Sequence, residues 1–202
     1  MALNLEKQLL FYGSYHHNPV NVGIHIVCVP FILLTAFQFG TNTPPLINAP
    51  DALVVKNLPL NLGTLASILY STLYVLMEPV AGGLLAPLLI GGTAYANYLT
   101  STYGTTANYT SLAVHLLCWI AQFVGHGAFE GRAPALLDNL VQAVFLAPFF
   151  VWMEILFYFG YRPELKGRLD KGVSAEISKF KKSRDANSRV VNGNVNGSAK
   201  QT

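Results

Sequence analysis

A long, nearly charge-free stretch limits what this chain can fold into. Besides histidine, residues 20–160 carry only seven acidic or basic side chains, namely Asp51, Lys56, Glu78, Glu130, Arg132, Asp138 and Glu154. The whole chain is 11% charged, whereas an average soluble domain has about 25%. Several apolar runs within the stretch approach the ~20 residues that a helix needs to cross a bilayer. The sequence therefore predicts an all-α, polytopic membrane helical bundle surrounded by lipid.

Five apolar runs define the expected bundle: 20–40, 60–77, 80–99, 111–127 and 140–160. Pro148 and Glu154 interrupt the fifth run, which favours a re-entrant or interfacial segment packed on protein. We expect four spans plus this fifth segment, with five full spans as the alternative. Only Glu78 and Pro79 separate the second and third runs, so these should form a tight antiparallel pair. Residues 100–110 are polar and uncharged, and are expected to form a turn.

The charge distribution predicts an orientation. Ten of the thirteen Lys and Arg residues follow Gly160, so the positive-inside rule places this tail in the cytosol. Lys7 favours the same side for the N-terminus, whose sequence does not resemble a cleavable signal. We expect an amphipathic segment with a histidine motif over 1–19, a membrane domain over 20–161, and a basic cytosolic tail over 162–202 with a disordered end. No aromatic and basic stripe indicates a nucleic-acid partner.

Four of the five histidines fall at one membrane depth on this topology: His16 and His17 before the first span, His25 in its first turns, and His126 at the end of the fourth. Imidazole suits iron, zinc and copper, and histidines from separate segments can form a transition-metal site. His115 lies eleven residues before His126, about 16 Å along a straight helix. It is therefore expected to pack between helices.

Polar residues after the fourth run extend the candidate site. Glu130 shares a helix face with His126, and three roles are open to it: a metal ligand, a general base, or an acceptor that orients an imidazole. A salt bridge to Arg132 is the structural alternative. Asp138 is expected to cap a helix that begins near Asn139. Glu154 needs a partner because a buried carboxylate is costly.

Other motifs exclude several classes of protein. The chain has too few histidines for a di-iron membrane desaturase, and it contains no CxxC, HExxH, GxSxG or P-loop pattern. The glycine pairs at 82–83 and 91–92 suit close helix packing. Cys28 and Cys118 lie in apolar runs and are expected to be free core thiols.

Two segments resemble a known family. YHHNPVNVGIH at 15–25 and WIAQFVGHGAFEGRAPALLDNLVQAVFLAPFFVWMEILF at 119–157 are similar to the fungal 2-hydroxy fatty acid dioxygenase family of the endoplasmic reticulum. The resemblance covers most of residues 5–165. It implies a multi-pass enzyme that uses Fe²⁺ and dioxygen to shorten a 2-hydroxy fatty acid by one carbon during phytosphingosine breakdown.

The resemblance also implies site residues. The family's histidines fall on His16, His17, His25 and His126, the candidate metal ligands, and its glutamates fall on Glu130 and Glu154. Glu130 and Arg132 are the expected catalytic residues, with Arg132 expected to assist binding of the substrate carboxylate. Two other functions stay open: a small transporter or lipid-binding scaffold, and a zinc-dependent lipid hydrolase.

Overall fold

The computed structural model describes residues 4–48, 50, 55–131 and 140–198, with backbone alone at 141, 142 and 185–198. The helices are α1 (Leu5–Tyr15), α2 (Pro19–Gly40), α3 (Leu62–Met77), α4 (Pro79–Tyr103), α5 (Thr105–Gly125), α6 (Leu140–Tyr158) and α7 (Pro163–Ser198), and a π-helix, η2 (His126–Glu130), continues α5. No strand occurs in the described ranges. The helical bundle expected from the sequence is confirmed.

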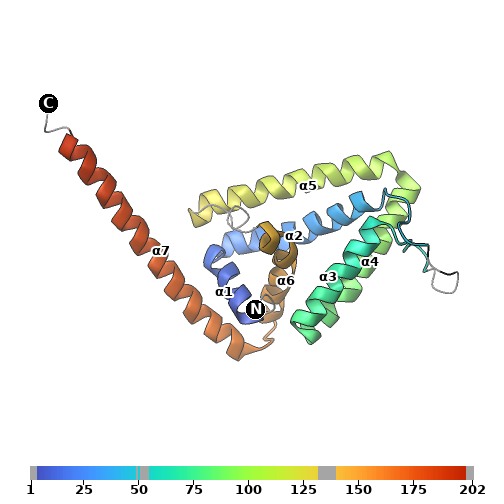
Figure 1. Cartoon of the computed structure of the whole chain (residues 1–202), viewed down its shortest axis with the longest axis horizontal. Coiled ribbons are helices and arrows are strands. Elements are labelled where there is room, and N and C mark those ends of the chain that lie inside the picture. The colour runs from blue at the N-terminus through green and yellow to red at the C-terminus, as the bar shows by residue number, and fades with distance from the viewer. Residues whose placement is uncertain (1–3, 49, 51–54, 132–139, 199–202) are drawn as a thin grey trace.

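Two long helices and one hairpin form the frame of the bundle. Helix α2 runs alongside α5, and the α3–α4 hairpin packs across one end of this pair (Figure 1). Glu78 alone separates α3 from α4 and caps α4 by accepting a hydrogen bond from the N–H of Ala81. The tight helix pair predicted around Glu78 and Pro79 is therefore confirmed.

Helix α6 lies in the centre of the bundle, where Phe149, Phe150 and Met153 are fully buried. Pro148 lies within this helix and has no N–H to donate to the carbonyl of Val144. The hydroxyl of Tyr70 donates to that carbonyl oxygen at 3.2 Å. A proline is tolerated at membrane depth when a neighbouring helix satisfies the freed backbone group in this way.

Three helical segments among the described residues are long and apolar enough to cross a membrane: α2, α4, and α5 with η2. Residues Ala143–Tyr158 and Pro163–Arg184 form a bent pair at 117° that makes a fourth if it is one span. Helix α3 has 16 residues, about 24 Å, because Asn61 caps its start and Pro79 follows its end. The structure therefore has three candidate spans, or four if the bent pair is one span. Helix α6 runs unbroken past Pro148 and Glu154, so the bend follows Tyr158 and does not lie at those two residues.

The turn expected at 100–110 is wrong. Helix α4 continues to Tyr103 and α5 begins at Thr105, so Gly104 alone breaks the helix, at a φ of +49° that favours glycine. The polar residues here serve helix contacts: Gln38 of α2 donates to Thr100 and Asn108 at 3.1 and 2.7 Å. Their polarity reflects hydrogen bonds between helices.

The basic tail forms α7, which projects from the bundle (Figure 1). Its first turns pack on α1. Arg168 forms a bidentate ion pair with Glu6, and both nitrogen–oxygen distances are 2.9 Å. The helix extends to Ser198, beyond the point where the composition predicted disorder.

Candidate metal centre

Two histidines enter the site with a defined tautomer. The Nδ1 of His16 lies 2.9 Å from the carbonyl oxygen of Tyr12, and the Nδ1 of His25 lies 2.9 Å from the carbonyl oxygen of Asn21. A carbonyl oxygen only accepts, so each Nδ1 carries the proton. Each Nε2 therefore keeps a lone pair, which is the form of imidazole that binds a metal.

The third histidine comes from the other end of the chain. His126 is the first residue of η2 and is 3% exposed. Its Nδ1 is buried without a hydrogen-bond partner. Gly125 lets this segment approach α2 closely, because a Cβ at that position would lie 2.4 Å from Oδ1 of Asn21. A single-turn π-helix is frequent at functional sites, and here it joins a spanning helix to the cluster.

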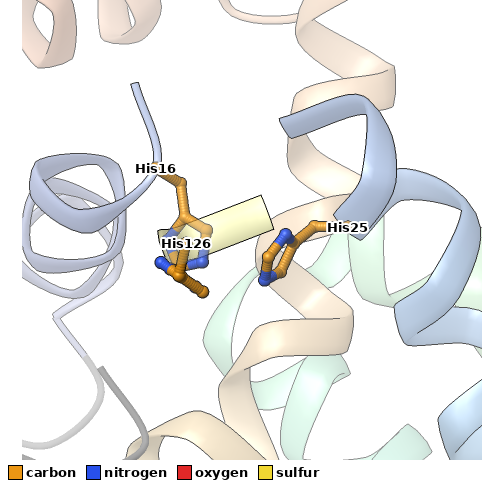
Figure 2. Close-up of side chains that lie close together, drawn as sticks. All are labelled: His16, His25 and His126. Carbon is orange, nitrogen blue, oxygen red and sulfur yellow. The ribbon is translucent and has the colours of Figure 1, made fainter. Parts of the chain in front are cut away.

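The three imidazoles converge although they come from three different segments (Figure 2). One ligand atom of each of His16, His25 and His126 lies within 4.8 Å of the others. The ring centroids are 4.4, 4.7 and 5.0 Å apart, with the planes at 71–83° to one another. All three side chains are buried. This is the one cluster of three or more potential ligands in the described part of the chain.

The donor set fits a transition metal. Burial, together with the neighbouring His25, holds the pKa of His16 well below its usual value, so its ring is neutral. Three neutral imidazoles suit iron, zinc or copper. The unpartnered Nδ1 of His126 is unusual in a folded protein, where buried polar atoms are nearly always paired, and a nearby ion would account for it.

Glu130 ties η2 to the start of α2. Its Oε1 accepts hydrogen bonds from the N–H groups of His17 and Asn18, each at 2.9 Å, and from the side-chain amide of Asn21 at 3.1 Å. Its Oε2 lies 2.5 Å from Nδ1 of His17, and the side chain of Glu130 is 1% exposed. A carboxylate at a helix N-terminus is also favoured by the helix dipole. Glu130 therefore anchors the segment that carries His16 and His25.

The structure does not bring His17 into the cluster. Its side chain is 36% exposed and pairs with Glu130. From the sequence, His17 was expected to be one of four candidate metal ligands. Arg132 and Asp138 lie outside the described residues, so neither the expected role of Arg132 nor the expected cap has a structural counterpart here.

His115 forms hydrogen bonds through both of its ring nitrogens. The indole N–H of Trp119 donates to its Nε2 at 3.0 Å, and its Nδ1 lies 2.8 Å from the hydroxyl of Thr35. Both ring nitrogens are therefore engaged in helix contacts, as expected from its distance along the helix. Glu154 lines a cavity beside His16 together with Lys166.

Sequence reasoning missed two supporting residues. Asn21 is fully buried; its backbone carbonyl accepts a hydrogen bond from Nδ1 of His25, and its side-chain amide donates to Glu130. Tyr12 stacks on His16 with centroids 4.0 Å apart and a 15° angle between the planes. Each precedes its histidine by four residues, the spacing at which a ring nitrogen reaches a carbonyl on the preceding helical turn. This four-residue spacing is the sequence signal that could have identified the two supporting residues.

Fold and donor set together define a polytopic helical membrane protein with a buried three-histidine site. The chain belongs to the Mpo1-like family: the model of the 2-hydroxy-palmitic acid dioxygenase Mpo1-like family matches residues 2–159. This agrees with the resemblance seen in the two sequence segments.

A characterised relative supports the same assignment. The chain is 39% identical to the 2-hydroxy-palmitic acid dioxygenase MPO1 of Saccharomyces cerevisiae over 168 residues, which cover 83% of this chain and 88% of the yeast protein. No solved structure matches the chain.

Proposed function

We propose that this protein is a non-haem Fe²⁺ dioxygenase that performs α-oxidation of 2-hydroxy fatty acids such as 2-hydroxypalmitate. The convergence of His16, His25 and His126 to within 4.8 Å, in a member of a family named for this dioxygenase, carries the proposal. The yeast relative bears the same activity in its name.

The reaction balances with dioxygen alone as oxidant. The bond between C1 and C2 of the 2-hydroxy acid breaks, and C1 leaves as carbon dioxide. C2 becomes the carboxyl carbon of an acid one carbon shorter, taking one oxygen atom from dioxygen, while the other oxygen atom leaves as water. Iron(II) held by the three histidines would supply the position where dioxygen and the 2-hydroxy acid meet.

The protein's own groups would hold and shield this position. The carbonyls of Tyr12 and Asn21 fix the rings of His16 and His25, and neutral ligands leave the charge of the ion free to attract a carboxylate. We assign Glu130 a positioning role, because both of its oxygens are occupied by donors or by His17. Arg132, two residues further along, remains our candidate for the positive charge beside the substrate carboxylate.

The cellular setting follows from the same proposal. We infer that the enzyme is a multi-pass protein of the endoplasmic reticulum membrane that acts in phytosphingosine and sphingolipid degradation. Both termini would be cytosolic, with residues 20–161 forming the catalytic domain and 162–202 the basic tail. Glycosylation at the Asn196-Gly-Ser sequon would contradict this orientation, because acceptor sites are modified on the lumenal side.

The test uses the full chain, purified in detergent and reconstituted in nanodiscs. Metal analysis is expected to find one iron per chain, and 2-hydroxypalmitate is expected to be converted to a 15-carbon acid with one dioxygen consumed per turnover. Chelation should abolish turnover, and Fe²⁺ but not Zn²⁺ should restore it. Turnover without dioxygen would favour a zinc hydrolase, and the absence of both metal and oxygen consumption would favour a transporter or scaffold.

A further inference from the structure

A large cavity opens beside the histidine cluster. It has a volume of about 610 Å³ and is lined by His16 and by parts of α1, α2, α6 and α7. Helices α2 and α7 each line the cavity with residues three or four positions apart, which lie on one face of the helix and which we call its stripe. On α2 the stripe is Pro19, Val22, Gly23 and Ile26, and on α7 it runs from Lys166 to Ile177. One face of each helix therefore forms one wall.

A second cavity continues the first. Its volume is about 420 Å³, and it extends along α6 to Ile155 and Tyr158. The two cavities have five lining residues in common: Val22, Ile26, Glu154, Phe157 and Lys166. They therefore form one continuous channel, which we call the α2–α7 groove. Ligand pockets for molecules of moderate size usually have volumes of roughly 300–1,000 Å³.

Away from His16, the lining of the groove suits an alkyl chain better than a carboxylate. Val22, Ile26 and Phe157 supply apolar surface common to both cavities. Among the charged residues of the groove, Lys166 forms an ion pair with Asp170, which leaves Glu154 as an added acidic group. Glu154, Lys166 and Asp170 together carry one more acidic group than basic group, which disfavours a further carboxylate beside them, so an acid in the groove should direct its carboxyl end toward His16.

We infer that the α2–α7 groove holds the alkyl chain of the 2-hydroxy acid, with the carboxyl end at the histidine cluster, and that α7 forms one wall of the substrate site. This inference rests on the proposed function. It gives the tail a role in substrate selection, although α7 lies beyond residues 2–159 matched by the family model.

Gly23 offers a specific test. It lines the groove, and a Cβ built there would meet nothing within 4 Å. The first added carbon therefore has open space around it, and replacing a helical glycine favours the helix. The series Gly23→Ala, Gly23→Leu and Gly23→Phe places progressively larger groups in the path of the alkyl chain.

The expected result is a dependence on chain length. Gly23→Phe should lower kcat/KM for 2-hydroxypalmitate at least tenfold, leave 2-hydroxyhexanoate within twofold, and keep the iron content of the unmodified protein. Gly23→Leu should give an intermediate loss and Gly23→Ala little change. Gly91→Phe is the matched control, because Gly91 is an exposed helical glycine of α4 where an added Cβ would meet nothing within 4 Å. Equal losses for both substrates, or no loss with 2-hydroxypalmitate, would overturn the inference.

A photolabelling experiment separates failure of the inference from failure of the proposed function. The unmodified protein is illuminated with 2-hydroxypalmitate that carries a diazirine at mid-chain, and the labelled residues are mapped by mass spectrometry. Labels on the α2 and α7 stripes, competed by unlabelled 2-hydroxypalmitate, support the groove even in a protein that consumes no oxygen. Labels confined to the exposed faces of α3–α5 would overturn the groove even in a protein that turns over its substrate.

Discussion

Glu130 accepts a hydrogen bond from the backbone N–H of Asn18 at 2.9 Å, although 112 residues separate the two positions. This contact joins the end of the α5–η2 segment to the start of α2. Since His126 begins η2 and His16 and His25 flank the start of α2, the same contact sets the distance between the three imidazoles. Substitutions near the Glu130–Asn18 contact should therefore weaken metal binding while the helical fold is retained.

His126→Ala should remove both iron and turnover, because two imidazoles would remain where three converge. Iron per chain is measured by elemental analysis, and membrane insertion by yield of monodisperse protein. His115→Ala is the matched control: it should keep iron and activity while losing about 1 kcal/mol of stability from its hydrogen bond to Thr35 of α2. Full activity of the His126→Ala variant would exclude His126 from the site.

His17→Ala should keep about one iron per chain, since the side chain of His17 pairs with Glu130 and lies outside the cluster. Turnover should fall several-fold because Glu130 loses one of its partners. Iron titration into the metal-free protein measures the affinity. Loss of iron as complete as that of His126→Ala would instead make His17 a ligand.

Glu130→Gln should weaken iron binding by about 10–100-fold, the usual effect of removing a group that orients metal ligands. The amide keeps one acceptor for the N–H groups of α2 but loses the charge that faces His17. At saturating iron, turnover should return to near that of the unmodified protein. A turnover defect that persists with the site fully loaded would point to proton transfer by Glu130.

Gly125→Ala should lower iron affinity, because its Cβ would lie 2.4 Å from Oδ1 of Asn21 and 3.3 Å from Cδ1 of Ile24. Asn21 is fully buried and bonded to Glu130, so relief of the clash moves η2 or breaks that bond. Gly127→Ala is the control two residues away, where a Cβ would meet nothing within 4 Å. Equal iron affinity of the two variants would contradict the close-approach argument.

Acidification should loosen α7 from α1. The hydrogen bond and charge of Arg168 hold the pKa of Glu6 below its usual value, so the pair is intact at neutral pH and is lost as pH falls through the folded-state value. Spin labels at exposed positions 7 and 171 should therefore show a broader distance distribution below about pH 4. Glu6→Gln should show that broad distribution already at neutral pH, and an unchanged narrow distribution in this variant would refute the prediction.

The sequence alone determined the membrane character, the helical class and the family. Charge depletion over residues 20–160 and apolar runs are local properties, and a helix satisfies its own backbone groups within each run. The candidate metal-ligating histidines could be chosen by their approximate depth in the membrane. His115 could be excluded because it lies too far from His126 along the same helix. Local polarity misled at Thr100 and Asn108, where it serves contacts between helices.

Tertiary structure alone decided which of those histidines meet. His16 and His17 are neighbours in sequence, yet one faces the cluster and the other faces Glu130, because α1 ends at Tyr15 and the chain turns through both residues before α2 begins at Pro19. The role of Glu130 depends on N–H groups more than 100 residues away, and the groove needs four helices to form its walls. Such choices depend on the close approach of distant segments, which periodicity and spacing within one segment do not encode.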